Sequence, residues 1–272
     1  MNQHPSLAAA IITYNEAENI RDCLDSVKDF VDEIVVLDSF SSDATETICR
    51  EYEKVHFLQH VFEGHIQQKN RAIEACQTDW VLALDADERV SSPLRHSIEA
   101  FLNSQPTVHG AKFPRLTYHL KKYIHHGGWY PNARYRLIRR GKAYWGGENP
   151  HDRLIIEGEG TQLKGDLIHL SFKDLSDQVQ TINHFSSIVA LTRYNKGRPA
   201  SLGRMVGKPI SKFLEIYLLK RGFLDGIPGL IIAVSSAYST FLKEAKLYEL
   251  NRLEADLPSN LSTALYQKSR QP

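Results

Sequence analysis

The sequence has few cysteines and almost no excess of charge of either sign. Its 272 residues include Cys23, Cys49 and Cys76, which are too few and too evenly spaced for a disulfide framework or a CxxC metal site. Lys and Arg number 33 against 32 Asp and Glu, so no overall field steers the chain to nucleic acid. With 42% hydrophobic residues the chain is not globally disordered. The cysteines are therefore predicted to be ordinary thiols in a reducing cytoplasm.

The sequence also lacks a long hydrophobic run. The first apolar run ends at Ile12 and no Lys or Arg precedes Leu7, so no signal peptide is expected. The uncharged stretch 226–242 approaches the length of a membrane span, but Pro228, Gly229 and several Ser and Thr lower its hydropathy. Its large side chains recur at helical spacing on one side. We predict a buried or interfacial helix there, with a spanning helix as the alternative.

Apolar runs and helical patterns alternate over the first hundred residues. The predicted helices begin at the caps Asn15, Asp43 and Ser92, with a further helix over 66–76. The predicted strands are 7–13, 34–37, 55–58 and 80–84. Strict alternation implies right-handed crossovers between parallel strands. The predicted fold class is therefore α/β, with a mostly parallel sheet and helices on both of its faces.

The pattern changes after residue 105. Residues 112–145 are aromatic, basic and glycine-rich, as in short antiparallel strands, and 163–172 is predicted to be one more strand. From Asp174 the pattern is helical, and the stretch 193–221 holds eight Lys and Arg against Glu215. We therefore divide the chain into a ligand-binding half, a second half, a basic helical extension and a polar tail, at 1–105, 106–185, 186–255 and 256–272.

Acidic and polar side chains follow three of the predicted strands. Asp85-Ala86-Asp87 ends the run 80–84, Thr13-Tyr14-Asn15-Glu16 ends the first strand, and Asp38-Ser39 ends the second. The carboxyl ends of parallel strands meet at one edge of a sheet, where ligands bind. Two converging carboxylates suit Mg²⁺ or Mn²⁺, which in turn suits a diphosphate. The sequence has no glycine-rich phosphate loop, so a metal and side chains would replace it. The alternative is a solvated acidic turn.

The ordered set of these segments resembles a known family. Thr13-Tyr14-Asn15-Glu16, Val36-Leu37-Asp38-Ser39, Lys69-Asn70-Arg71-Ala72 and Leu84-Asp85-Ala86-Asp87-Glu88 are similar to segments of the inverting family 2 glycosyltransferases with a GT-A fold. Gly128-Trp129-Tyr130-Pro131, 163–170 and 222–226 resemble the bacterial lipopolysaccharide inner-core glucosyltransferase branch. The similarity covers roughly Leu7 to Leu250 and implies a GT-A domain followed by a C-terminal helical extension.

The resemblance implies that residues 1–105 bind a nucleoside-diphosphate-sugar, with a UDP-sugar as the expected donor. It places Asp38 toward the base, Asp85 near the ribose and the metal, and Asp87 on the metal. Lys69 and Asn70 stand where the family often has Arg-Asn. The donor-binding residues predicted in this way are Thr13, Tyr14, Asn15, Glu16, Asp38, Ser39, Lys69, Asn70, Asp85 and Ala86. The predicted metal ligands are Asp87, Asp85 and His169, and the metal is Mg²⁺ or Mn²⁺.

The resemblance also implies a catalytic base in the second half. Asp152 in His151-Asp152 matches this position, although close relatives often carry Glu there, which is one methylene longer. The alternative is a loop carboxylate paired with Arg153. His169 completes the metal shell or contacts the diphosphate, and a structural histidine is the alternative. The predicted acceptor-binding residues are Trp129, Tyr130, Arg134, Arg136 and His151, in a region of aromatic and basic residues that also includes Trp145.

Together these features predict a metal-dependent, inverting glycosyltransferase. It would move a hexose to a hydroxyl of a glycan or lipid-linked acceptor, in the synthesis of lipopolysaccharide core or cell-envelope polysaccharide. The alternatives are a catalytically silent, membrane-associated protein that binds carbohydrate or nucleotide-sugar, and a sugar nucleotidyltransferase. We expect a cytoplasmic protein, held peripherally on an anionic membrane surface, and no nucleic-acid partner.

Overall fold

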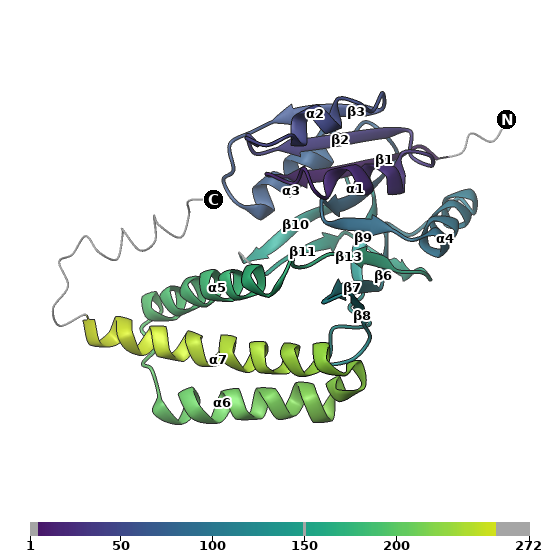
Figure 1. Ribbon diagram of the computed structural model, residues 1–272. Coiled ribbons are helices and arrows are strands. Elements are labelled where there is room, and N and C mark those ends of the chain that lie inside the picture. The colour runs from purple at the N-terminus through teal and green to yellow at the C-terminus, as the bar shows by residue number, and fades with distance from the viewer. Residues whose placement is uncertain (1–4, 149–150, 254–272) are drawn as a thin grey trace. The chain divides into compact units, whose positions relative to one another are not determined.

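The computed structural model describes residues 5–148 and 151–253, without the side chains of Glu148, His151 and Leu253. The predicted tail at 256–272 lies outside this description. The chain forms two compact units (Figure 1). The sheet unit comprises the chain up to Tyr118 together with Tyr130–Ser171, and the helical unit comprises His119–Trp129 together with the chain from Phe172.

A seven-stranded sheet forms the centre of the sheet unit, in the order β12-β6-β9-β4-β1-β2-β3. Strand β9 runs antiparallel to both of its neighbours, β4 and β6, and the other neighbouring strands are parallel. This confirms the predicted mostly parallel sheet. The strands are β1 (Leu7–Thr13), β2 (Glu33–Asp38), β3 (Val55–Gln59), β4 (Trp80–Asp85), β6 (Gly110–Phe113), β9 (Arg134–Arg139) and β12 (Gly160–Gln162).

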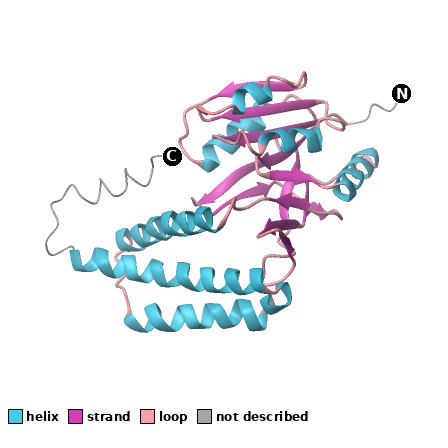
Figure 2. Cartoon of the chain, viewed as in Figure 1, coloured by secondary structure: helices cyan, strands magenta, loops and turns pink. Residues whose placement is uncertain are grey.

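Both faces of this sheet are covered (Figure 2). Alternate residues of a strand point to opposite faces, so Ala9 and Ile11 of β1 pack in one core with α1 (Ile20–Val27) and α4 (Ser92–Asn103). Ala8 and Ala10 pack in the other core with α3 (His65–Ala75) and a hairpin. The hairpin strands are β10 (Ala143–Glu148) and β11 (His151–Ile156), and α2 (Thr45–Cys49) adds Cys49 to the first core. The three cysteines are buried and unpaired, as predicted.

All three predicted helix caps differ from the structure. Ala44 rather than Asp43 precedes α2, although Asp43 accepts a hydrogen bond from the Thr45 amide. The residue that precedes α1 is Asn19, and Asn15 has a left-handed backbone, with φ of 53°, which a helix cap does not adopt. For α4 the cap is Ser91, which accepts a hydrogen bond from the Leu94 amide, so Pro93 lies one position further into the helix than predicted. Adjacent serines at 91 and 92 give the same sequence signal.

A smaller group of strands follows the acidic turn at residues 85–87. Strand β13 (Leu167–His169) pairs antiparallel with β5 (Glu88–Val90) and parallel with β7 (Arg115–His119). The strand predicted at 163–172 is thus only three residues long, because Gly165, with φ of +92°, turns the chain beside α4. Only glycine fits there, since a Cβ at this position would lie 2.4 Å from the Leu94 amide nitrogen. Strand β5 was not predicted.

The helical unit confirms the predicted C-terminal helical extension. Its elements are β8 (Lys122–Ile124), α5 (Leu175–Asn195), α6 (Leu202–Leu214), the π-helical turn η1 (Glu215–Leu219), the 3₁₀ turn η2 (Gly222–Asp225) and α7 (Ile227–Leu253). Helix α7 lies between α5 and α6 (Figure 1). Its buried Glu244 accepts hydrogen bonds from Arg193 and Arg204, so Glu215 is not the only acid that opposes the basic stretch. Among the described residues, no helix has both the length and the apolar character that crossing a bilayer requires.

Candidate active site

The carboxyl ends of β1, β2 and β4 meet at one edge of the large sheet, which we call the carboxylate edge. Thr13 is in register with Asp38, and Ile12 with Asp85. Strand β9 runs the other way, with Leu137 opposite Leu82, so its first residues reach the same edge. The acidic ends of parallel strands and the basic start of an antiparallel strand are therefore brought together.

Asp85 is held by two cations. Its carboxylate lies 3.1 Å from Lys69 Nζ and accepts a 2.9 Å hydrogen bond from Arg136 Nη2. Burial works to raise the pKa of Asp85, but the positive charges of Lys69 and Arg136 outweigh it and hold the pKa far below its usual range. Asp85 therefore stays ionised, with its oxygens directed at protein cations.

Glu88 is a buried member of this cluster to which the sequence analysis assigned no role. Its carboxylate accepts hydrogen bonds from the Asp85 amide at 3.0 Å and from Arg136 at 2.8 Å, and it lies 3.6 Å from Arg115. Burial opposes the charge of Arg136, but Glu88 and Asp85 more than offset this and raise its pKa. A glutamate with no exposed surface needs such partners, so Glu88 fixes the turn that carries Asp85.

Lys69 bridges the two parts of the site. Its ammonium lies 3.1 Å from Asp85 Oδ1 and donates a 2.9 Å hydrogen bond to Asp152 Oδ2. It also lies over the ring of Trp145, 4.4 Å from the centroid. The neighbouring Asn70 exchanges two hydrogen bonds with the Trp145 backbone, at 2.8 and 2.9 Å. Helix α3 thus fixes the hairpin that presents Trp145 and Asp152.

Asp152 lies on β11, opposite Gly147 of β10. The structure pairs its carboxylate with Lys69, and the sequence alternative, a pair with Arg153, is not found among the described contacts. The Asp152 side chain is 14% exposed. The predicted base is therefore brought to the carboxylate edge from a segment 67 residues beyond Asp85 in the sequence.

Asp87 and His169 form a second pair. The Nε2 atom of His169 lies 3.2 Å from Asp87 Oδ2, and the Nδ1 atom of His169 hydrogen bonds with the Ser171 hydroxyl. Asp87 Oδ1 is buried and accepts no hydrogen bond from the part of the chain that the structure describes. Within residues 5–148 and 151–253, no three His, Cys, Asp or Glu side chains are grouped as a metal site. Asp85 is turned to its cations rather than to this pair.

The predicted donor-binding residues share one end of the sheet. Asp38 is fully buried and accepts hydrogen bonds from Ser41 and Gln59, so it shapes the loop that follows β2. Asn15 joins this loop by accepting from the Ser42 amide at 2.8 Å, while Ser39 accepts from Gln68. The Thr13 hydroxyl is buried without a hydrogen-bond partner among the described residues. The remaining members contribute a half-exposed Tyr14, the Glu16 amide bonded to Thr45, and the buried Ala86.

The predicted acceptor-binding residues do not form one group. Trp129 belongs to the helical unit, where it stacks on His119, whereas Tyr130 belongs to the sheet unit and donates a hydrogen bond to Asp166. Arg136 is buried against Asp85 and Glu88. Arg134 is exposed at the start of β9, and the side chain of His151 lies outside the described residues.

Acidic and basic groups balance at the carboxylate edge. Partial burial, then Arg115 and Arg136, lower the pKa of Arg134, and Asp152 works in the opposite direction, so Arg134 belongs to the same electrostatic cluster. Apart from Asp38 at the end of β2, the carboxylates here are Asp85, Asp87, Glu88 and Asp152, and the cations are Lys69, Arg115, Arg134 and Arg136. The edge therefore has no surplus positive charge with which to hold a diphosphate.

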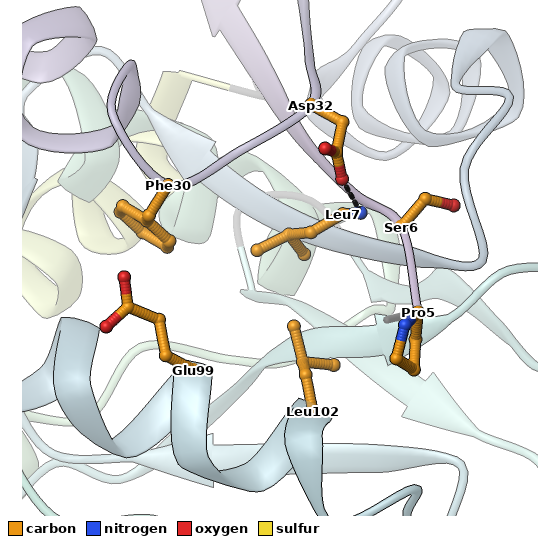
Figure 3. Close-up of a pocket in the computed structure, with 7 residues that line it drawn as sticks. All are labelled: Pro5, Ser6, Leu7, Phe30, Asp32, Glu99 and Leu102. Carbon is orange, nitrogen blue, oxygen red and sulfur yellow. Dashed lines mark hydrogen bonds between the residues drawn. The ribbon is translucent and has the colours of Figure 1, made fainter. Parts of the chain in front are cut away.

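A pocket of about 160 Å³ lies elsewhere, at the amino end of β1 (Figure 3). Leu7, Phe30 and Leu102 line it together with two carboxylates, Asp32 and Glu99. Asp32 is occupied in accepting a 2.8 Å hydrogen bond from the Leu7 amide. Because β1 runs from Leu7 to Thr13, this pocket is at the opposite end of the strand from the carboxylate edge.

Residues 9–153 match the family model described as glycosyl transferase family 2. The chain is 29% identical to the lipopolysaccharide core biosynthesis glycosyltransferase LpsC of Rhizobium meliloti (strain 1021), over 92% of this chain and 94% of that protein. It is 28% identical to an uncharacterized glycosyltransferase of Rickettsia prowazekii (strain Madrid E), over 90% and 87%. Among solved structures, glucosyl-3-phosphoglycerate synthase from Mycobacterium tuberculosis aligns over 40% of this chain and 43% of that chain, with 22% identity and a TM-score of 0.34.

Proposed function

This chain belongs to glycosyl transferase family 2, and on that premise we propose that it moves a hexose from a UDP-sugar to a hydroxyl of a glycan or lipid-linked acceptor. The observation that carries the proposal is the Lys69 bridge, which joins Asp85 of the acidic turn to Asp152 of the β10–β11 hairpin. A donor-side group and a candidate base are thereby held within one ion-pair cluster. In this reaction the acceptor oxygen displaces the diphosphate and inverts the anomeric carbon.

Asp152 is the proposed general base. A carboxylate near the start of β11 can take the proton of an acceptor hydroxyl while that oxygen attacks the anomeric carbon. Lys69 orients Asp152 through the 2.9 Å hydrogen bond, and Trp145 in turn fixes the position of the Lys69 ammonium. The hairpin supplies both Trp145 and Asp152, so the base and the ring that contacts Lys69 belong to one structural element.

The departing diphosphate needs positive charge, and the charges of the cations at the carboxylate edge are already balanced by its carboxylates. Asp87, whose Oδ1 has no hydrogen-bond partner among the described residues, and His169 fit a divalent cation that takes its other ligands from phosphate and water. When bound there, Mg²⁺ or Mn²⁺ neutralises charge on the diphosphate as a Lewis acid. The Ser171 hydroxyl fixes the His169 ring, as outer partners of ligating histidines do.

The likeness to LpsC, which is described as a lipopolysaccharide core biosynthesis glycosyltransferase, supports the proposed acceptor class. The alignment covers nearly all of both chains, helical unit included. We therefore place the proposed reaction in the synthesis of lipopolysaccharide core or another cell-envelope polysaccharide.

The variant Asp152→Asn tests the proposal, because it keeps the shape of the side chain and removes the base. We expect transfer from a UDP-hexose to lipopolysaccharide-core oligosaccharides to fall about 10²–10⁴-fold, the usual value of general base catalysis. Binding of UDP with Mn²⁺, measured by calorimetry, is expected to stay unchanged. Glu157→Gln, on the exposed end of the same hairpin, is the matched control and should transfer normally. Transfer at the wild-type rate by Asp152→Asn would refute the assignment of the base.

A further inference from the structure

Helix α6 presents a row of large apolar side chains to solvent. Leu202, Val206, Ile210 and Leu214 recur every four residues and are 75%, 54%, 57% and 43% exposed. Residues four apart lie on one side of a helix, so the row runs the length of α6. Soluble monomers rarely leave an apolar face of this extent uncovered, which indicates an interaction surface.

Helix α7 carries a second row. Its members are exposed by 39% to 75% and repeat every three or four residues: Ile227, Leu230, Val234, Tyr238 and Phe241. On other sides of the same helix Ile232, Ala233 and Leu247 are buried. Helix α7 thus has one apolar side that packs within the helical unit and another that does not. The connection from α6 to α7 adds the exposed Leu218, Leu219, Phe223 and Leu224.

The helical unit also concentrates positive charge. Residues 172–253 include twelve Lys and Arg and six Asp and Glu, a net charge of +6 where the whole chain has +1. Lys208 is exposed on the side of α6 opposite the apolar row. Lys220 and Arg221 are exposed in the connection that carries the four apolar residues. Basic side chains that border an apolar helix face are typical of helices that lie in the interface of an anionic membrane.

We propose that the apolar rows of α6 and α7 dock on an anionic phospholipid bilayer, with the helices lying in the interface rather than crossing it. The apolar rows enter the boundary between headgroups and acyl chains, while Lys220 and Arg221 contact lipid phosphates. A protein partner would leave the net charge of +6 without a specific role, whereas an acidic lipid surface matches it along the whole unit. The proposal depends on neither donor nor acceptor.

Vesicle flotation of the full chain tests this docking. We expect binding to vesicles of phosphatidylglycerol and phosphatidylcholine, weak binding to phosphatidylcholine alone, and release by high salt. Val206→Gln with Ile210→Gln should reduce partitioning about tenfold or more, because two large apolar groups no longer enter the interface. Arg221→Gln should reduce it about five-fold, the value of one basic group near the surface. Both variants change exposed residues, so circular dichroism should confirm an intact fold.

Matched controls come from the sheet unit. Val61→Gln replaces an apolar residue that is 63% exposed, and Lys142→Gln neutralises an exposed cation. Neither should change flotation. Three results would overturn the proposal. The first is no flotation at low salt together with a dimer in light scattering, and the second is flotation only after residues 254–272 are deleted. The third is equal binding to vesicles by the wild type and by the variant that combines Val206→Gln and Ile210→Gln. The first would identify a second copy as the occupant, and the second would identify the chain's own C-terminal residues.

Discussion

The Lys69 ammonium holds two carboxylates at once, and a double-mutant cycle measures what this bridge contributes to stability. Lys69→Met keeps an unbranched stem beside Trp145 and removes the charge. Lys69 is 9% exposed, and breaking a buried ion pair typically costs about 3–5 kcal/mol. Asp85 keeps Arg136 at 2.9 Å, however, and Asp152 reaches water, so we expect Lys69→Met to lower the free energy of unfolding by about 2–3 kcal/mol.

The cycle combines Lys69→Met with Asp152→Asn. Asp152→Asn alone keeps an oxygen that can accept from Lys69 and should cost about 1 kcal/mol. If the two side chains interact as the 2.9 Å contact indicates, the double variant should lose less than the sum of the single variants, with a coupling of about 1–2 kcal/mol. Urea unfolding followed by tryptophan fluorescence gives the four free energies.

An exposed pair on α1 provides the reference. Lys28 and Asp25 lie 2.7 Å apart with both side chains 44% exposed, and such pairs couple by about 0.2–1 kcal/mol. The reasoning fails if the effects of Lys69→Met and Asp152→Asn are additive within about 0.5 kcal/mol, because the two side chains would then contribute no interaction energy to stability. It also fails if the coupling merely equals that of Lys28 and Asp25.

Three further predictions concern the metal, pH and the thiols. Asp87→Ala should lower transfer by about 10²-fold or more and abolish the Mn²⁺ dependence of UDP binding in calorimetry. The control Glu53→Ala, at an exposed position, should change neither transfer nor UDP binding. Mn²⁺-dependent UDP binding by Asp87→Ala would contradict the metal assignment. The charges of Lys69 and Arg136 outweigh the effect of burial and lower the pKa of Asp85 in the folded chain. Ionised Asp85 therefore stabilises the fold above about pH 4, and this contribution is lost as the pH falls further. Urea unfolding from pH 7 to 3 should show the loss, with a shallower slope for Lys69→Met. Burial raises the pKa of Cys49 and of Cys76 to about 12. At pH 8 the thiols of the folded protein should therefore react with a thiol reagent far more slowly than those of the protein unfolded in urea. Equal reaction rates would refute this prediction.

The sequence predicted the sheet well because its signal is local. Each strand of the parallel core is a short apolar run that ends at a polar group, and the runs at 7–13, 34–37, 55–58 and 80–84 each correspond to a strand in the structure. Strand β5 could not be predicted in this way, since three residues show no period. The missed cap at Asn15 has a similar origin, because asparagine favours both helix caps and left-handed turns.

The candidate site was predictable in its acids and less so in its cations. Asp85, Asp87 and Asp152 come with recognisable neighbours in the sequence, but their partners are set by pairing between distant strands. Arg136 was predicted to bind acceptor, whereas the structure buries it against Asp85 and Glu88. One signal was available: a glutamate that directly follows the acidic turn needs a cation as its partner if the fold buries it.

The reversed direction of β9 has a consequence for how the chain folds. Three acids of the carboxylate edge, Asp85, Asp87 and Glu88, lie within the first 88 residues, and the arginine that pairs with Asp85 and Glu88 comes from residue 136. During synthesis the amino-terminal strands emerge first and carry these acids with Lys69 but without Arg136. Repulsion among these acids disfavours closing the sheet around β4 until β9 has been added between β4 and β6. A fragment that ends before β9 therefore lacks both the strand that joins β6 to β4 and the arginine that pairs with Asp85 and Glu88.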